Sequence, residues 1–411
     1  MLSVSDAIAA VLNATSPLVP ESLPLAETLG LVLAEDIYSN TDLPPFDKSL
    51  VDGFAIRLSS FQSELPVLEI VSAGQVPTRQ LDQAACIQIM TGAQLPIGAD
   101  AVVPIEHTSP RSDANGKMVV TFSSNVATWR SGTNIIRRGA ALKHGELVVI
   151  SGSELRPQEL GALAELGHAN VRTRRRPRVA ALATGDELVP IDQTPGPGQI
   201  RNSNELMLCA QIRRAGADPI PLGIARDERA HLRERIEAGL QADVLVLSGG
   251  VSMGEKDLVP SELAAVGVRQ VFHKVNVKPG KPAWFGVLDK SPTANSPVSR
   301  TLVFGLPGNP VSSMVCFELF VRPALRHLMG YAAAEPTPIK ARLTQAHTTK
   351  GDRPTYHPAR IEWHPNGPTV TAVPWVGSSD LRATVAANSM ALFPAGDQTY
   401  KTDSIVDVIT W

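Results

Sequence analysis

Several carboxylate residues follow segments that have the character of buried strands. Glu187 comes shortly after the apolar segment 179–182, and Asp257 follows the segment 244–247. Asp227 also comes directly after a strand-like segment. Because ligands bind at the carboxyl ends of strands in open parallel sheets, we expect these side chains to share one site. Carboxylates without neighbouring His or Cys suit a hard cation, and we predict a Mg²⁺ site with Asp227 and Asp257 as metal ligands.

Glycine-rich and basic segments of the same region indicate an anion. The segments SGGVS (248–252) and PGNPVS (307–312) let backbone N–H groups point at an oxyanion, and a following helix favours negative charge. Lys274, Lys278 and Lys281 add positive charge. Cations beside acids suit an anionic substrate with a bound metal, as in phosphate-ester or pyrophosphate chemistry.

Each of these residues also has an ordinary explanation. Asp257 could cap the next helix, and Lys274 and Lys278 could be surface residues of a strand. The sequence has no G-x-x-x-x-G-K-[ST] segment, which argues against a P-loop enzyme. It also has no strand followed by G-x-G-x-x-G, which argues against a nicotinamide cofactor. Taken together at converging strand ends, the residues favour a site.

The patterns of strands and helices divide the 411 residues into four parts. Strands alternate with helices over residues 178–330, which predicts a doubly wound α/β domain. Residues 43–146 contain many short strand-like segments and predict an inserted β domain. Residues 1–42 and 147–177 are expected to form one discontinuous helical and linking domain. Residues 331–411 predict a small β barrel, so the fold class is multidomain, α/β plus β.

The composition is that of a globular protein, and it gives no case for a nucleic-acid or membrane partner. Hydrophobic residues make up 43%, charged residues 19%, and the net charge is −2. No apolar run approaches the roughly 20 residues needed to span a bilayer. The N-terminal segment is a poor signal peptide and predicts an amphipathic helix that Ser3 or Ser5 could cap. Three scattered cysteines fit a reducing compartment, so we expect a cytoplasmic location.

Three residues of the N-terminal half have competing explanations. Asp47 is best explained by a turn in which its side chain accepts from backbone N–H groups. Asp52, which precedes a glycine, is assigned to function. Thr91 could belong to a turn or contact a ligand, and neither explanation is favoured. The basic segment 172–178 is interpreted as a solvated linker rather than a nucleic-acid patch, because it is short and has no aromatic partners.

A series of motifs in a fixed order resembles a known family. The motifs are FDKSLVDGFA, IMTGAQLPIGADAVVPIE, GTNIIRRG, RPRVAALATGDEL, GQIRNSNELML, GIARDE, SGGVSMGEKD, KVNVKPGKP and FGLPGNPVSS. The series resembles the molybdopterin molybdenumtransferase family, which includes bacterial MoeA and the E domain of gephyrin, over about residues 5–410. Each motif alone is moderately specific, whereas the ordered set is very specific.

This resemblance implies a fold, a reaction and an assembly. The implied fold is an elongated, four-domain homodimer in which the active site is shared between subunits. The implied reaction inserts molybdate into the dithiolene of adenylylated molybdopterin and releases AMP, with Mg²⁺ assisting. A molybdopterin adenylyltransferase and apo-molybdoenzymes are the implied protein partners.

The resemblance also assigns residues by motif. The acidic active-site residues would be Asp52, Glu187, Asp227 and Asp257. The pterin nucleotide would be lined by Thr91, Ser248, Gly249, Gly250, Ser252, Lys274, Lys278 and Lys281, with Asp52 and Thr91 acting from the other subunit. Molybdate would be held by Ser312, Lys278, Lys281, Arg353 and Ser378. The strand-end residues Thr184, Pro307, Gly308 and Asn309 complete the predicted cofactor-binding set.

Two departures from the family pattern leave alternatives open. Ala140 and Ala141 stand where the family often has an acidic pair, which removes negative charge near the predicted cation site. Lys48 stands in place of an asparagine and is a milder change. The alternatives are a non-catalytic pterin-binding carrier or scaffold and a tungstate-preferring paralogue. A nucleotide-processing α/β enzyme would account for residues 178–330 alone.

Overall fold

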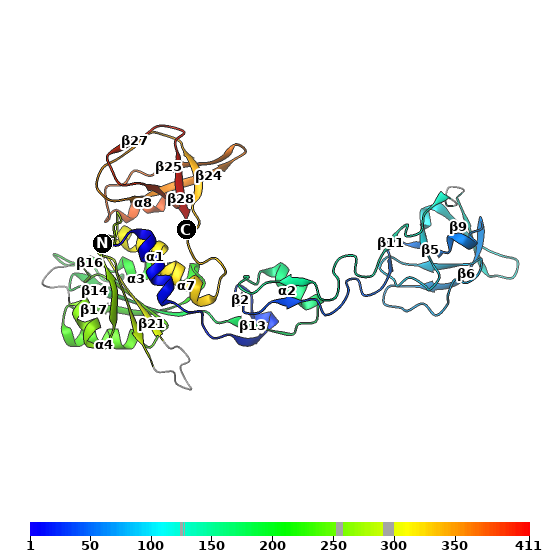
Figure 1. The fold of residues 1–411 in the computed structure, drawn as a ribbon, viewed down its shortest axis with the longest axis horizontal. Coiled ribbons are helices and arrows are strands. Elements are labelled where there is room, and N and C mark those ends of the chain that lie inside the picture. The colour runs from blue at the N-terminus through cyan, green and yellow to red at the C-terminus, as the bar shows by residue number, and fades with distance from the viewer. Residues whose placement is uncertain (124–125, 127, 252–257, 291–299) are drawn as a thin grey trace. The chain divides into compact units, whose positions relative to one another are not determined.

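The computed structural model describes the chain except residues 124–125, 127, 252–257 and 291–299 (Figure 1). The described residues form two compact units. Unit 1 consists of Met1–Glu35, Ser151–Leu160 and Ala169–Trp411, and unit 2 consists of Asp36–Ile150 and Gly161–His168. Unit 1 is therefore discontinuous in sequence.

A six-stranded sheet lies at the centre of the α/β domain in unit 1, in the order β17-β14-β18-β21-β20-β19. The strands are β14 (Arg178–Thr184), β17 (Asp218–Ala225), β18 (Val244–Ser248), β19 (Arg269–His273), β20 (Trp284–Asp289) and β21 (Arg300–Leu306). Neighbours from β17 to β21 pair in parallel. The pairs β21–β20 and β20–β19 are antiparallel. The predicted α/β class is confirmed, with an antiparallel pair added at one edge.

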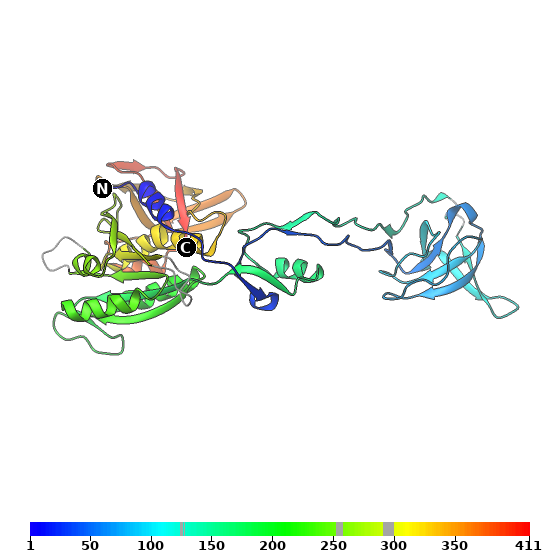
Figure 2. The ribbon, with the colours of Figure 1, turned by 60° about the horizontal axis from the view of Figure 1, so that its bottom comes forward.

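Helices cover both faces of this sheet. They are α1 (Val4–Ala14), α3 (Ser203–Arg214), α4 (Arg229–Gly239), α5 (Val259–Ala265), α6 (Pro310–Cys316) and α7 (Arg322–Met329), with the π-helical segment η5 (Phe317–Val321) between the last two. Side chains of α1, α3, α6 and α7 share one core, and those of α4 and α5 share the other. Figure 2 shows the blue α1 on one side of the sheet and the green α4 on the other.

The sequence of β18 explains how one strand serves both cores. Its side chains alternate between the faces of the sheet, as strand geometry requires. Val244 and Val246 pack with the first core, and Leu245 and Leu247 pack with the second. A strand that is apolar on both faces is typical of the centre of a parallel sheet covered on each side.

The N-terminal helix differs from the expected domain division. Ser3 caps α1 by accepting from the backbone N–H of Asp6 at 3.0 Å, which fits the predicted helix start. However, Val4, Ala7 and Val11 pack in the core of the α/β domain. The helix pattern identified an apolar face, but it could not tell which core that face would join.

The C-terminal residues form the predicted small barrel, also in unit 1. The closed barrel has the order β22-β25-β24-β26-β28. Its strands are β22 (Ile339–Leu343), β24 (Thr355–His364), β25 (Gly367–Ala372), β26 (Ser389–Phe393) and β28 (Ile405–Thr410). Beside it lie β23 (His347–Thr349), paired with β27 (Gln398–Tyr400), and the helix α8 (Leu381–Val385). Closure leaves the barrel strands without an open edge.

Unit 2 is built on a second six-stranded sheet, in the order β8-β5-β7-β6-β10-β9. Its strands are β5 (Gly53–Ile56), β6 (Glu64–Val71), β7 (Cys86–Ile89), β8 (Ala101–Pro104), β9 (Thr108–Ser112) and β10 (Met118–Phe122). The two-stranded pairs of this unit are β4 (Lys48–Ser49) with β11 (Ile135–Ile136), and β3 (Ile37–Tyr38) with β12 (Leu147–Val149). The structure thus contains the expected strand-rich insertion.

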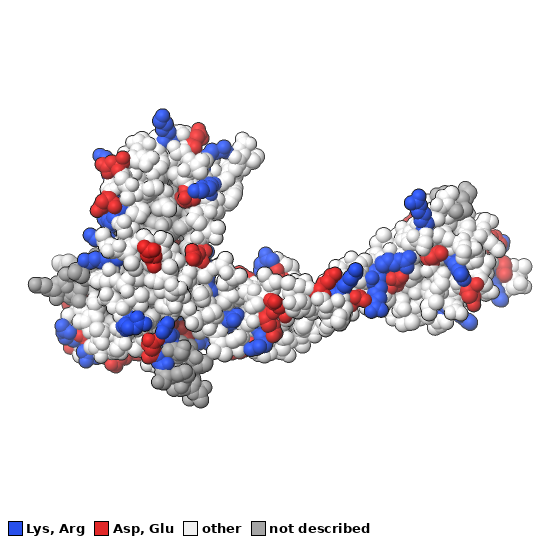
Figure 3. Space-filling view, in the orientation of Figure 1, with Lys and Arg blue, Asp and Glu red and all other residues white. Residues whose placement is uncertain are grey.

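Short elements complete the fold. They are the three-stranded sheet β1 (Glu21–Pro24)–β13 (Asn170–Arg174)–β2 (Val32–Leu33), the pair β15 (Leu188–Val189)–β16 (Ile200–Arg201), the helix α2 (Pro157–Glu165), and the 3-10 turns η1 (Leu25–Glu27), η2 (Leu58–Ser60) and η3 (Ile105–His107). No described helix has both the length and the apolar character that a membrane crossing requires. On the face shown in Figure 3, basic and acidic side chains are mixed over both units.

The basic segment 172–178 is not the solvated linker that its sequence suggested. Arg174 donates to the carbonyl oxygen of Leu18 at 3.1 Å. Arg175 forms an ion pair at 2.7 Å with Asp243, which is buried. The sequence pattern could not show these partners, because they lie far from the segment along the chain.

Replacing Gly53 by alanine is expected to destabilise unit 2. Gly53 pairs with both neighbouring strands, and a Cβ atom there would lie 1.9 Å from the carbonyl oxygen of Val103. The backbone of β8 would have to move, and overpacking of this kind costs about 1–3 kcal/mol. Hydrogen–deuterium exchange should become faster in peptides that contain β5 and β8, and stay unchanged in unit 1.

Gly161→Ala is the matched control, because it adds the same methyl group to unit 2 in open space. Gly161 lies in α2, and nothing lies within 4 Å of a Cβ placed there. In a helix this change should stabilise by about 0.5–1 kcal/mol. If hydrogen–deuterium exchange is unchanged in Gly53→Ala, the backbone of β8 can move aside without loss of stability, and the prediction is wrong.

Candidate functional site

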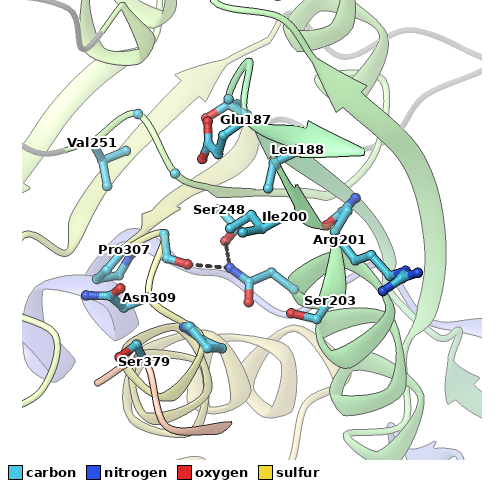
Figure 4. Close-up of a pocket in the computed structure, with 18 of the residues that line it drawn as sticks. Glu187, Leu188, Ile200, Arg201, Ser203, Ser248, Val251, Pro307, Asn309 and Ser379 are labelled. Carbon is cyan, nitrogen blue, oxygen red and sulfur yellow. Dashed lines mark hydrogen bonds between the residues drawn. The ribbon is translucent and has the colours of Figure 1, made fainter. Parts of the chain in front are cut away.

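A cavity of about 730 Å³ lies at the carboxyl ends of β14, β18 and β21 (Figure 4). We call it the strand-end cavity. Of the residues predicted from the sequence, it is lined by Thr184, Glu187, Asp227, Ser248, Gly249, Gly250, Pro307, Gly308 and Asn309. Three strand ends, far apart along the chain, therefore meet where ligands bind in parallel sheets.

Glycine is required in the loop that follows β18. Gly249 has a φ of 100°, and a Cβ atom there would lie 2.6 Å from the carbonyl oxygen of Thr184. Gly250 has a φ of 64°, and its Cβ would lie 2.7 Å from Val259. Both conformations disfavour other residues, and both positions lack room for a side chain. The backbone of this loop can therefore closely approach both β14 and a ligand.

Asn204, which sequence reasoning missed, joins two walls of the strand-end cavity. Its Nδ2 donates to Ser248 Oγ and to the carbonyl oxygen of Gly308, both at 2.7 Å (Figure 4). Ser248 Oγ lies 3.3 Å from Ser313 Oγ, which in turn donates to the carbonyl oxygen of Pro307 at 2.5 Å. These bonds hold the start of α3 against the loops that follow β18 and β21.

The amide of Asn204 has a defined orientation. Gly308 offers a carbonyl oxygen, so the group facing it has to be the amide nitrogen. The Oδ1 atom is buried and has no hydrogen-bond partner among the described residues. The motif GQIRNSNELML contains Asn204, but only the approach of three separate segments reveals its position.

Two carboxylate side chains are among the described residues that line the strand-end cavity. Glu187 and Asp227 are exposed and line it, and the backbone N–H of Asp227 donates to Asp186 Oδ1 at 3.1 Å. No His or Cys is among the described lining residues. Asp257 lies outside the described residues, which contain no group of three His, Cys, Asp or Glu side chains placed to hold a metal. The oxygen donors present fit a hard cation such as Mg²⁺.

A second cavity, of about 490 Å³, has a different character, and we call it the cationic cavity. It is lined by the whole predicted molybdate set, Lys278, Lys281, Ser312, Arg353 and Ser378. Pro282, Pro307 and Asn309 line both this cavity and the strand-end cavity. No Asp or Glu is among the described residues that line it, so three positive side chains face it without a carboxylate.

Backbone contacts position the residues of the cationic cavity. Arg353 Nη1 donates to the carbonyl oxygen of Val277 at 3.0 Å, and the N–H of Lys278 donates to that of Pro354 at 2.9 Å. Asn309 Nδ2 donates to Ser378 Oγ at 2.9 Å. The C-terminal barrel and the α/β domain are thus joined around the cavity, and both supply residues to it.

Three predicted residues lie elsewhere, and a second one, besides Asp257, lies outside the described part. Lys274 lines neither cavity, and its backbone N–H donates to the carbonyl oxygen of Ala283 at 2.9 Å. Ser252 lies outside the described residues. Asp52 and Thr91 belong to unit 2 and contact each other.

A local structural role explains the pairing of Asp52 and Thr91. Asp52 Oδ1 accepts from the backbone N–H of Thr91 at 2.6 Å and from its hydroxyl at 2.8 Å. These hydrogen bonds hold the pKa of Asp52 below its usual value. Asp47 accepts from the backbone N–H of Arg138 at 2.8 Å and pairs with Arg137 at 2.6 Å. Both partners lie far along the chain, so these contacts are not the local turn that the sequence suggested for Asp47.

Comparisons with known proteins cover nearly the whole chain. Residues 2–167 match the model of the MoeA N-terminal region (domain I and II), residues 180–327 a probable molybdopterin binding domain, and residues 340–411 the MoeA C-terminal region (domain IV). A molybdopterin molybdenumtransferase of Staphylococcus aureus is 33% identical over 99% of this chain and 95% of its own length. The same values hold for a Staphylococcus epidermidis relative with the same name. A solved molybdopterin biosynthesis moeA protein of Pyrococcus horikoshii is 28% identical, covers both chains completely and has a TM-score of 0.80.

Proposed function

Because the chain belongs to the molybdopterin molybdenumtransferase family, we propose that it inserts molybdate into adenylylated molybdopterin and releases AMP. The observation that carries this proposal is the pair of adjoining cavities in unit 1. One has carboxylates and glycine-rich backbone at strand ends, and the other has three cations and no described carboxylate. A nucleotide-bearing substrate and a metal oxyanion need these two environments side by side.

In this proposal the strand-end cavity binds the pterin nucleotide. Its volume of about 730 Å³ lies within the usual range of small-molecule sites. Its wall combines the backbone of Gly249 and Gly250 with polar side chains such as Ser248 and Asn309. Backbone N–H groups in such loops suit phosphate oxygens. The substrate would therefore be oriented mainly by hydrogen bonds.

The cationic cavity would bind molybdate as a substrate. Lys278, Lys281 and Arg353 balance the charge of a tetrahedral dianion, and charge-assisted hydrogen bonds of this kind are about twice as strong as neutral ones. Ser312 and Ser378 add hydroxyl groups. Because Pro307 and Asn309 line both cavities, the oxyanion would be held next to the pterin nucleotide.

Mg²⁺ dependence forms part of the proposal. Asp227 and Asp257 are the residues that would hold the ion, and Glu187 lines the same cavity as Asp227. When bound, Mg²⁺ would neutralise charge on the pyrophosphate that links AMP to the pterin. The carboxylates themselves would orient the water that attacks this linkage.

Assembly, location and several residue roles stay predictions. We propose a homodimer in the cytoplasm that exchanges substrate with a molybdopterin adenylyltransferase and delivers cofactor to apo-molybdoenzymes. Sedimentation velocity tests the dimer. The proposed substrate roles of Asp52, Thr91, Lys274 and Ser252 require substitution and binding measurements.

AMP release tests the proposed function. Purified protein, adenylylated molybdopterin and Mg²⁺ are mixed with increasing molybdate or tungstate, and AMP is measured by chromatography. Release that depends on molybdate is the expected result, and it would show that the acidic pair replaced by Ala140 and Ala141 is dispensable. Release with tungstate alone would identify tungstate, rather than molybdate, as the oxyanion substrate. Tight binding without release under either oxyanion would favour the carrier function.

Asn204→Ala is expected to weaken binding of the pterin nucleotide. The change removes both hydrogen bonds that join α3 to Ser248 and Gly308. Loss of these bonds should weaken substrate binding by about 1–2 kcal/mol, so KM should rise about tenfold and kcat should change less. Steady-state AMP release against pterin-nucleotide concentration measures both constants.

A neighbouring amide serves as the control for Asn204. Gln199 accepts from the backbone N–H of Gly196 at 3.0 Å and does not line the strand-end cavity. Gln199→Ala should keep the wild-type KM. If Asn204→Ala also keeps it, the bridge between the loops does not position the substrate.

A further inference from the structure

A third cavity, of about 390 Å³, lies on the barrel side of the cationic cavity, and we call it the barrel cavity. Its wall includes Lys278, His347, Lys350, Thr355, His357 and Trp375. Two of them, Lys278 and Trp375, also line the cationic cavity. The two cavities therefore adjoin. Of the site residues predicted from the sequence, Lys278 alone is among the described residues that line the barrel cavity.

The charge of the barrel cavity favours an anion. Lys278 and Lys350 line it, and none of its described lining residues is Asp or Glu. Two acidic residues that contact the segment after Lys350 have other partners. Asp352 lies 3.6 Å from Arg353, and Asp397 accepts from the backbone N–H of Gly351 at 2.9 Å. Two ammonium groups thus face the cavity without a carboxylate in its wall.

The two histidines of the barrel cavity add a neutral wall. Burial lowers the pKa of His357 to about 4, and burial also lowers the pKa of His347. The ring of His347 stacks on Phe393 with centroids 4.4 Å apart and lies 4.7 Å from that of His357. Both rings are therefore uncharged near pH 7, and the positive charge of the cavity comes from the lysines.

These histidines do not make a convincing metal site. His357 Nε2 is hydrogen-bonded to the carbonyl oxygen of Val373 at 2.9 Å, and because a carbonyl oxygen can only accept, this nitrogen carries a proton. A metal would then have two imidazoles and no carboxylate or thiolate from the described lining residues. Structural and catalytic zinc sites use at least three protein ligands.

Hydrogen-bond donors complete the surroundings of an anion. The Nε1 atom of Trp375 is buried and has no hydrogen-bond partner among the described residues. Among the described residues, the hydroxyl of Thr355 has only a long contact, at 3.5 Å, with the carbonyl oxygen of Arg353. Lys278 Nζ has one neutral acceptor, the carbonyl oxygen of Lys350 at 3.3 Å. These groups keep donor capacity for oxyanion oxygens.

We propose that the barrel cavity is a second oxyanion site, which holds a tetrahedral dianion of the molybdate class before it enters the cationic cavity. The proposal rests on the proposed binding of molybdate in the cationic cavity. Lys278 lines both sites, so the ion can keep one charged contact while it moves. The cationic cavity adds Lys281 and Arg353, whereas the barrel cavity adds Lys350 alone. Transfer inward is therefore favoured by charge.

Counting bound molybdate tests the second site. Equilibrium dialysis of the full chain with molybdate alone, read by elemental analysis, should give two ions per wild-type chain. The double variant His347→Phe/Lys350→Met keeps a ring against Phe393 and removes one charge. It should bind one ion, with the affinity of the second site weakened about tenfold or more. Lys281→Met should instead weaken the other, tighter site.

Lys401→Met is the matched control for lost charge. Lys401 is exposed, follows β27, which pairs with β23, and does not line the barrel cavity. This variant should keep two ions. One ion in the wild type, two ions in the double variant, or a loss in Lys401→Met equal to that in the double variant would each overturn the second site.

The same measurement separates this inference from the proposed function. If the wild type binds one ion and Lys281→Met loses it, the barrel cavity is not a site while the cationic cavity remains one. If Lys281→Met leaves binding unchanged, the assignment of molybdate to the cationic cavity fails, and the barrel site fails with it.

Discussion

Asp227→Asn is expected to lower molybdate-dependent AMP release by about 10²–10³-fold while the protein keeps its fold. Asparagine has nearly the same shape as aspartate but no charge. Asp227 is exposed at the end of β17, where it lines the strand-end cavity, so no buried packing is lost. The backbone hydrogen bond from Asp227 to Asp186 is kept, because the side chain of Asp227 does not make it.

The loss should have a defined kinetic form. A carboxylate that holds a cation and orients water acts on the reaction more than on substrate binding, so kcat should fall and KM should change little. Isothermal titration should also show weaker Mg²⁺ binding without any substrate present. Circular dichroism and thermal unfolding would confirm that the variant is folded.

Asp218→Asn provides the control on the same strand. Asp218 is exposed and begins β17, so it lies at the opposite edge of the sheet from the cavity. The control should keep wild-type turnover. Wild-type turnover in Asp227→Asn as well would remove this residue from the catalytic set and leave Glu187 and Asp257 to be tested.

The double variant Arg229→Met/Arg233→Met is expected to destabilise unit 1 by about 3–5 kcal/mol at neutral pH. The side chain of Glu262 in α5 is fully buried, and it pairs with Arg229 at 2.6 Å and Arg233 at 2.8 Å from α4. Burial raises the pKa of Glu262, but the hydrogen bonds from Arg233 and Arg229 outweigh burial and lower it overall. Without both arginines, a buried carboxylate has lost its charged partners.

The effect should depend on pH in a direction that identifies Glu262. In the wild type, the lowered pKa contributes stability above the unfolded pKa of about 4.3, and this contribution is lost as pH falls. In the double variant burial acts alone and raises the pKa, so the penalty is greatest when the carboxylate is charged. The difference in unfolding free energy should therefore be largest near pH 7 and shrink toward pH 4.

Urea unfolding across this pH range measures the difference, and two variants control it. Arg235→Met removes an arginine of α4 whose Nε contacts His231 rather than Glu262, and should cost at most about 0.5 kcal/mol. Adding Glu262→Met to the double variant should restore most of the stability, because the buried, unpaired carboxylate is replaced by an apolar side chain. A double variant as stable as Arg235→Met at pH 7 would contradict the argument.

Local sequence patterns predicted much of the fold for a clear physical reason. The apolar runs of β14 and β18 identify strands that are buried on both faces, and the glycines after β18 identify a close approach of backbone. Both signals are local. By contrast, the pattern of α1 reveals an apolar face but not its partner, and the antiparallel edge strands β19 and β20 depend on pairing that no short segment specifies.

The candidate site divides in the same way. Ser312, Arg353 and Ser378 come from distant segments, and their common cavity was expected only through the family resemblance. Asn204 was missed because its role arises when a helix start meets two loops. The barrel cavity was missed for a related reason, since its wall combines Lys278 with a stack of rings from the barrel.

The discontinuity of unit 1 has a consequence during synthesis on the ribosome. Residues 36–150 are nearly all of unit 2 and can fold as soon as they emerge. Helix α1 emerges earlier, but its core also contains Leu325 and Leu328 of α7. At about 5–20 residues per second, the roughly 300 residues between them take about 15–60 s to translate. Throughout that interval the apolar face of α1 lacks its native neighbours from α7, so the nascent chain exposes apolar side chains that chaperones can bind.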